Sequence, residues 1–98
     1  MKRTKPQQSQ HDKKVEKIAK HWENQGAKVK AHIKGYTTPS KISGSIPDLE
    51  ISQAGQKRVI EVETPSSIKT AHAKEQRKDF QGWANKNNKR KFYSRVAK

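Results

Sequence analysis

The sequence predicts one α/β domain in which a helix is followed by three strands, a second helix and a last strand. Two patterns support this order. Apolar residues recur with the spacing of one helix face over residues 11–25 and 68–86. Apolar and polar residues alternate, as they do on half-buried strands, over residues 27–34 and in two further segments, 46–52 and 58–64.

Positive charge dominates the composition. The 98 residues include 23 lysines and arginines against 9 acids, a formal net charge of +14. This favours nucleic acid as the partner, because each cation set against a phosphate releases condensed counterions. Only 29% of the residues are hydrophobic, which allows a thin core and makes a homodimer a reasonable expectation. No long apolar run or signal peptide is visible, so we expect a cytoplasmic protein without a membrane partner.

The chain contains no cysteine, which excludes disulfides, thiolate catalysis and cysteine-based zinc sites. Its four histidines follow no zinc-motif spacing, so we expect them to be scattered and solvated. They are His11, His21, His32 and His72.

Residues 1–11 are predicted to form a flexible basic arm, and residues 12–98 a single domain. The arm is almost without apolar residues after Met1, so burial cannot offset the entropy lost on ordering it. Two roles remain open for it. It could lie on phosphates, or it could act as a solubilising tail.

The first helix is predicted from an apolar stripe, with Asp12 as its cap and Gly26 as its end. Glu16 lies beside this stripe and could reach under a neighbouring strand edge. Alternatively, Glu16 forms a solvent-facing pair with Lys20 one turn later, which contributes only a few tenths of a kcal/mol. The stripe consists of Val15, Ile18, Ala19 and Trp22.

The first strand, 27–34, is predicted to have one buried face and one basic face. The basic face could follow a nucleic-acid backbone, or it could simply keep a small sheet soluble. Glycine, proline and serine then indicate a loop over residues 35–45. Its segment Ser43-Gly44-Ser45 either lets a phosphate approach the backbone or is an ordinary connection. The basic face carries Lys28, Lys30 and Lys34.

The two following strands carry acids that a basic chain has no structural reason to keep. Side chains alternate along a strand, so pairing the apolar faces brings Asp48, Glu61 and Glu63 to one side of the sheet. Gly55 suits a tight turn between the strands. Acids clustered in this way suggest a metal ion held against a polyanion. The alternative is a solvated edge strand whose acids form salt bridges with Lys28 or Lys30.

A second helix is predicted after the break at Thr64-Pro65, and residues 91–96 are predicted to form the last strand. Gln76 is the polar member of an otherwise apolar helix face. If it is buried, it needs a hydrogen-bond partner. If it lies near a solvated helix end, it needs none. The face also contains Ala73, Phe80, Trp83 and Ala84.

With this order of elements, the chain resembles the PD-(D/E)XK nuclease superfamily, and in particular the small archaeal-type Holliday junction resolvases. The resemblance covers residues 12–97. It implies a minimal restriction-endonuclease-like core, of order αβββαβ, with a mixed four-stranded sheet flanked by helices. The matching pieces are Glu16, Ser43-Gly44-Ser45, Pro47-Asp48, Glu61-Val62-Glu63 and Gln76.

One position departs from the family pattern, which ends in lysine where this chain has Glu63. In the family that lysine is thought to orient or deprotonate water and to stabilise charge on the phosphorus. Three neighbouring carboxylates also repel one another, by about 1 kcal/mol per pair in water and by more when partly buried. Lys57 and Lys69 are two candidates for the missing cation.

The resemblance implies an Mg²⁺-dependent endonuclease that hydrolyses DNA phosphodiester bonds. Asp48 and Glu61 would hold Mg²⁺ or Mn²⁺. Glu63 would be a further ligand, or would accept the proton of the attacking water. Glu16 and Gln76 would support the site. The expected phosphate contacts are Lys28, Lys30, Lys34, Ser43 and Lys69.

We expect such a nuclease to select DNA by structure, such as a junction, because no extra subdomain is present to read bases. A twofold dimer would present two sites to two strands. Two other functions remain open. One is a non-catalytic nucleic-acid-binding protein that kept the nuclease fold after losing the lysine. The other is a ribosomal-type RNA-binding protein, which leaves the acidic strands unexplained.

Overall fold

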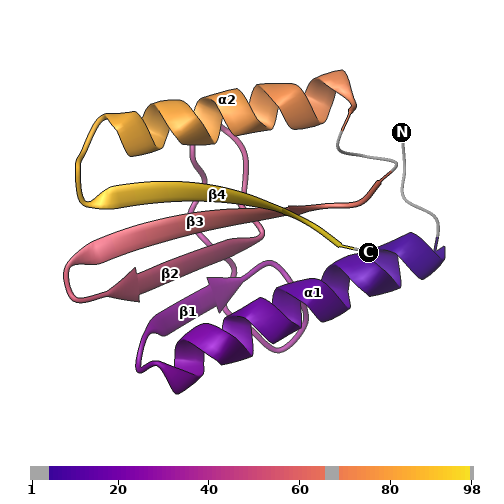
Figure 1. The fold of residues 1–98 in the computed structure, drawn as a ribbon, viewed down its shortest axis with the longest axis horizontal. Coiled ribbons are helices and arrows are strands. Elements are labelled where there is room, and N and C mark those ends of the chain that lie inside the picture. The colour runs from indigo at the N-terminus through magenta and orange to yellow at the C-terminus, as the bar shows by residue number, and fades with distance from the viewer. Residues whose placement is uncertain (1–4, 66–68, 98) are drawn as a thin grey trace.

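A computed structural model of the chain describes residues 5–65 and 69–97 (Figure 1). It confirms the predicted α/β class, with a four-stranded mixed sheet and two helices. In chain order the elements are α1 (Lys5–Asn24), β1 (Lys28–Ala31), β2 (Leu49–Gln53), β3 (Gln56–Glu63), α2 (Ala71–Asn85) and β4 (Arg90–Val96).

The sheet has the order β1-β2-β3-β4. The first three strands are antiparallel neighbours, and β4 runs parallel to β3 because α2 carries the chain back between them. Ala54 and Gly55 make the two-residue turn from β2 to β3 with φ angles of 52° and 79°. Two positive φ values are typical of the type I′ turn, whose twist matches that of the strands it joins.

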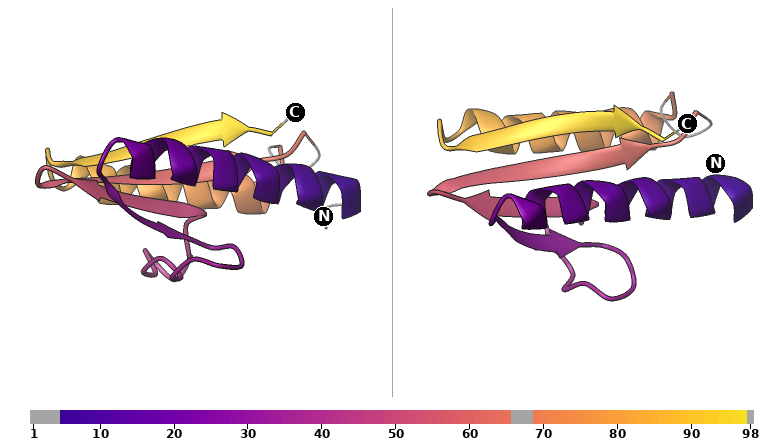
Figure 2. Two further views of the ribbon diagram at one scale, coloured as in Figure 1. Left: turned by 90° about the horizontal axis from the view of Figure 1, so that it is seen from below. Right: turned by 60° about the horizontal axis from the view of Figure 1, so that its bottom comes forward.

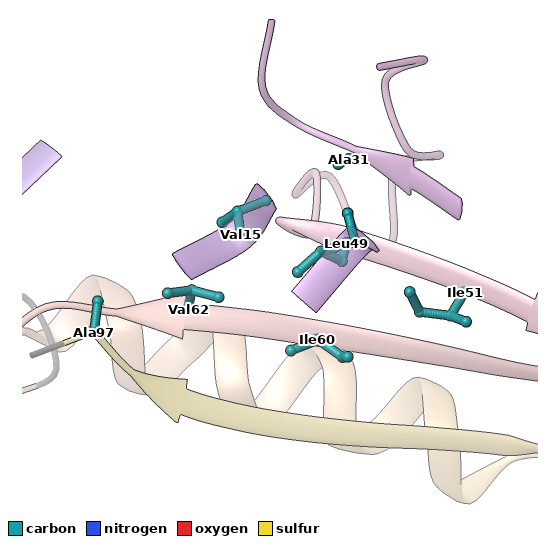
Figure 3. Close-up of a cluster of buried hydrophobic side chains, with 8 residues drawn as sticks. Val15, Ala31, Leu49, Ile51, Ile60, Val62 and Ala97 are labelled. Atoms are coloured by element: carbon teal, nitrogen blue, oxygen red, sulfur yellow. The ribbon is translucent and has the colours of Figure 1, made fainter. Parts of the chain in front are cut away.

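The two helices lie on opposite faces of the sheet (Figure 2). Under α1, Val15 and Ala19 pack against the inward residues of β2 and β3, including Leu49 and Val62, all with no exposed surface (Figure 3). Under α2, Phe80 packs against Val59. Strand alternation explains this division, because Val59 and Val62 are an odd number of residues apart and therefore face opposite sides.

The helix α1 begins at Lys5, so the prediction of a flexible arm was wrong for residues 5–11. Residues 1–4 lie outside the described part of the chain. The predicted cap, Asp12, lies inside the helix. The helix begins earlier because the burial of His11 at the sheet anchors this turn. The turn also contains good helix formers, and a proline such as Pro6 is tolerated near the start of a helix.

The end of α1 was predicted correctly. Gly26 has a φ of 86°, and its N–H donates to the Glu23 carbonyl at 3.0 Å. The N–H of Ala27 donates to the Trp22 carbonyl at 3.1 Å. This pair of bonds is a Schellman motif, which ends a helix at a residue with positive φ.

Two elements are shorter than predicted. β1 ends at Ala31, because the chain turns at Gly35, where φ is 93°, and Ala31 pairs its N–H with the Thr37 carbonyl. α2 begins at Ala71. Thr70 is its N-cap, and the Thr70 side chain accepts a hydrogen bond from the Ala73 N–H at 3.1 Å. Residues 66–68 lie outside the described part of the chain. Neither described helix is long and apolar enough to cross a membrane.

Candidate active site

A cavity of about 790 Å³ opens where β2 begins, β3 ends and α2 begins. It brings together four of the five residues predicted to be catalytic, from three separate parts of the chain: Asp48, Glu61, Glu63 and Gln76. Cations and polar groups complete the wall. Further lining residues are Gln8, His32, Lys41, Gly44, Ser45, Thr70 and His72.

Asp48 is fixed on both sides of its carboxylate. Its Oδ2 accepts a hydrogen bond from the Val62 N–H at 2.8 Å, and its Oδ1 lies 3.1 Å from His11 Nε2. The Asp48 N–H in turn donates to Glu61 Oε1 at 3.0 Å. These bonds tie the start of β2 to the end of β3. The Asp48 side chain is therefore held in one place, while 13% of it stays exposed to the cavity.

Glu61 and Glu63 are placed by the alternation of β3. They lie on the same face as Val59, below α2, and only 4% and 3% of their surfaces are exposed. A buried carboxylate costs several kcal/mol unless charges or hydrogen bonds compensate for it. Two features offer compensation at the cavity. The Asp48 N–H reaches Glu61, and α2 directs the positive end of its dipole toward the cavity, where Thr70 and His72 of its first turns lie.

Gln76 lies on α2 and lines the cavity as a partly exposed side chain. The apolar face around it is buried at Ala73, Phe80 and Ala84, as the sequence predicted. Gln76 therefore lies on the same side of α2 as these buried residues, and it lines the cavity together with the acids. Its amide can both donate and accept hydrogen bonds there.

Among the described residues, the lysine that lines this cavity is one that sequence reasoning did not single out. Lys41 lines the cavity from the loop before β2. Of the two earlier candidates, Lys57 lies 3.5 Å from the buried carboxylate of Glu50, and Lys69 is exposed and does not line the cavity. No sequence pattern relates Lys41 to the acids. The only hint that Lys41 lies near them was the length of the loop before β2.

His11 is the residue that sequence reasoning placed wrongly. Only 4% of its surface is exposed, and its Nδ1 lies 2.9 Å from Asp12 Oδ1 while its Nε2 faces Asp48. When protonated, it places one positive charge between two carboxylates. One signal was present in the sequence. His11 precedes Val15 by four residues and thus extends the apolar stripe of α1 by one turn.

The structure does not bring Glu16 to the cavity. Its carboxylate lies 3.5 Å from Lys20 Nζ on the solvent side of α1, and 54% of the side chain is exposed. The alternative of a surface pair is therefore confirmed. Glu16 follows Val15 directly and so points away from the stripe. The α1 residue that lines the cavity is Gln8, two turns earlier.

None of the predicted phosphate contacts lines the cavity. Lys28 and Lys30 are exposed on the edge strand β1, on the sheet face that also carries Glu50 and Glu61. Lys34 is exposed in the turn after β1. Ser43, with a φ of 51°, forms a tight turn closed by mutual hydrogen bonds between Ile42 and Ser45. That turn presents Gly44 and Ser45 to the cavity.

Among the described residues, no group of three or more acids and histidines is arranged to hold a metal ion by itself. Comparisons of this chain with family models, with curated proteins and with solved structures found no match.

Proposed function

We propose that this protein is a metal-dependent endonuclease that hydrolyses phosphodiester bonds in DNA, built on a restriction-endonuclease-like core. One observation carries the proposal. One carboxylate from just before β2, two from β3 and an amide from α2 line a single cavity of a chain whose net charge is +14. Acids buried at a cavity of a basic protein indicate a functional site. Such acids can hold cations, and the bound cations then attract a polyanion.

The donor set fits Mg²⁺ or Mn²⁺. Mg²⁺ takes oxygen ligands, and it is commonly held by one or two protein carboxylates, with waters and substrate phosphates completing its shell. Asp48 and Glu61 are such a pair, and the Asp48 backbone N–H donates to Glu61 Oε1 at 3.0 Å. A third protein ligand is not required for this mode of binding. When bound, the ion would lower the repulsion between the acids and the phosphate and polarise the P–O bond.

The residues of the chain would divide the remaining work. Asp48 is positioned by the Val62 N–H and by His11, so its carboxylate needs no reorganisation when substrate arrives. Glu63 would accept the proton of the attacking water. Lys41 would face the phosphate and stabilise the charge that develops on its oxygens, the role that the family gives to the lysine replaced by Glu63. His32 and His72, exposed at the rim, would contact neighbouring phosphates.

The test is cleavage of supercoiled plasmid and of a four-way junction in Mg²⁺ or Mn²⁺. Asp48→Asn should abolish cleavage, and Glu63→Gln should lower the rate by about 10²- to 10⁴-fold, the usual contribution of a general base. Glu75→Gln is the matched control, because Glu75 is exposed on α2 and does not line the cavity. Cleavage that survives Asp48→Asn would contradict the proposal.

Structure selectivity and a dimer belong to the same proposal. The six described elements add nothing to the core that could read bases, so this core should cut the junction faster than a linear duplex of the same sequence. A twofold dimer would place one cavity on each of two strands, which sedimentation of the protein with and without a junction measures. Such an enzyme would work on DNA inside the cell.

A second candidate is a nucleic-acid-binding protein without catalysis, and Glu63 is the observation that favours it. Glu63 puts a third carboxylate where the family has a cation. If the parent protein cuts nothing with either metal but binds DNA, this candidate is supported. Glu63→Lys then provides a sharp check. A gain of cleavage in that variant would identify an inactivated nuclease site.

A further inference from the structure

The sheet face under α1 is only partly covered. Within the described residues, α1 contacts β1, β2 and β3 but not β4. A groove of about 500 Å³ remains between α1 and β4. The strand register places Tyr93 beside Ile60 and Arg95 beside Val62. The side chains of Tyr93 and Arg95 therefore lie on the sheet face that packs against α1. This groove lies on the opposite face of the sheet from Glu61 and Glu63.

The groove is lined by cations and aromatic rings and by no acid. We call it the basic groove and define it by Lys14, Lys17, Trp22, Arg58, Tyr93 and Arg95. None of its four cations forms an ion pair with a carboxylate in the described part of the chain. The groove therefore presents uncompensated positive charge, although the same chain pairs Lys20 and Lys57 with acids elsewhere.

The two arginines of the groove are held against aromatic rings. The guanidinium carbon of Arg58 lies 4.6 Å from the centre of the Trp22 ring, and that of Arg95 lies 5.3 Å from the centre of the Tyr93 ring. Arg58 Nη2 donates to Gln56 Oε1 at 3.0 Å, while its Nη1 is buried without a hydrogen-bond partner among the described residues. A stacked guanidinium keeps a flat face and N–H donors in fixed positions.

We propose that the basic groove is a second nucleic-acid site, which binds a single strand independently of the carboxylate cavity. Flat rings and guanidinium planes take unstacked bases, and the flanking lysines take phosphates. A paired duplex hides the faces of its bases in the stack, so it cannot use such rings. A second copy of this chain is the less suitable occupant, because its four groove cations would face these four across a twofold axis.

Binding of short oligothymidylate and oligouridylate, measured by fluorescence anisotropy in EDTA at several salt concentrations, tests the groove without any metal-dependent cleavage. Each phosphate contact on a single strand contributes about 0.7 to the slope of log affinity against log salt. Lys14→Gln with Lys17→Gln should therefore reduce the slope by about 1.4. The matched control is Lys78→Gln on α2 with Lys86→Gln at its C-cap, both exposed, and it should leave the slope unchanged. An equal loss in the control pair would overturn the proposal.

The stacking contribution has its own variant. Tyr93→Leu should weaken binding by roughly 5- to 150-fold without changing the salt slope, since base stacking is insensitive to salt and strong per base. Tyr93→Phe keeps the ring and should restore binding, which separates stacking from folding. In a Trp83→Phe background Trp22 is the remaining tryptophan of the two in the chain, and its fluorescence should be quenched by the oligonucleotide. Full binding without this quenching would overturn the proposal.

Three further outcomes are decisive. Asp48→Asn should bind the oligonucleotides as tightly as the parent, because the groove and the cavity lie on opposite faces of the sheet. A blunt duplex that binds as tightly as the single strand, with the same dependence on Tyr93, would contradict a single-strand site. A dimer that dissociates on Tyr93→Leu in sedimentation would assign the groove to a second copy of the chain and would also contradict it.

Discussion

The two faces of the sheet carry different residues under their helices. Under α2, the strand β3 ends in Glu61 and Glu63, and the helix begins beside them, so acids and a helix N-terminus share one cavity. Under α1, the same strand contributes Ile60 and Val62 to an apolar core, and the uncovered remainder of the face is basic. Alternation along one strand thus separates an acidic surface from a basic one across the thickness of the sheet.

The two faces also differ in the sign of the charge that each one carries. A thin core leaves little apolar area to spare, and yet this chain buries carboxylates on one face and leaves cations unpaired on the other. Desolvation of the acids and mutual repulsion of the cations both work against stability. Ligands of opposite charge, a cation in the cavity and a polyanion in the groove, would offset these costs. The following predictions test the difference between the two faces, from the largest expected effect to the smallest.

The largest effect is expected from the two cores. Leu49→Ala empties a fully buried position under α1, and Phe80→Ala empties one under α2. Substitutions of this kind cost about 2–5 and 3–5 kcal/mol of unfolding free energy, respectively. In so small a domain either one should unfold most of the protein, as measured by urea denaturation followed by circular dichroism. Val29→Ala, on the partly buried edge strand, is the control and should cost less.

Mg²⁺ should stabilise the parent protein through the α2 face alone. At ten times its dissociation constant a ligand that binds only the folded state adds about 1.4 kcal/mol. For a domain of this size that raises the melting temperature by several degrees. Asp48→Asn should lose the shift, and Lys14→Gln in the groove should keep it. An equal shift in Asp48→Asn, at matched ionic strength, would place the ion elsewhere.

His11 is predicted to support the cavity from the α1 side. His11→Leu leaves the oxygens of Asp48 without the facing imidazole, which should cost about 1–3 kcal/mol of unfolding free energy and reduce cleavage. His11→Leu and Asp48→Asn should be strongly coupled in a double-mutant cycle, since each removes one partner of the same contact. Additive effects would show that the 3.1 Å contact carries no energy.

The smallest effect is expected at Tyr36, away from both ligand surfaces. Partial burial, and a hydrogen bond of 2.8 Å from its hydroxyl to Glu23, raise the pKa of Tyr36 above 10.0. The protonated form is the one favoured by folding, so its contribution is present below about pH 10 and is lost as the pH rises through the folded pKa. Tyr36→Phe should therefore cost less than about 1 kcal/mol at neutral pH, and nothing at strongly alkaline pH.

Much of the fold could be predicted from the sequence because its signals are local. The periodicity of 11–25 identified a helix that ends at Gly26, and the alternation of 46–52 and 58–64 identified a hairpin that turns at Gly55. The same alternation predicted that Glu61 and Glu63 share a face. Local patterns failed at the start of α1, where the polarity of residues 5–11 indicated an arm and the burial of His11 instead extended the helix.

The candidate site was predictable only for its acids and for Gln76. Asp48, Glu61 and Glu63 could be singled out because acids gathered on one sheet face are unexpected in a basic chain, and Gln76 because it is polar on an otherwise apolar helix face. By itself the sequence also determined the helix periods, the turn at Gly55 and the excess of positive charge. Only the tertiary structure decided that Lys41 and His11 approach the acids, that Glu16 does not, and that Tyr93 and Arg95 line an uncovered face. The reason is that such neighbours meet through the packing of distant segments, which no local period encodes.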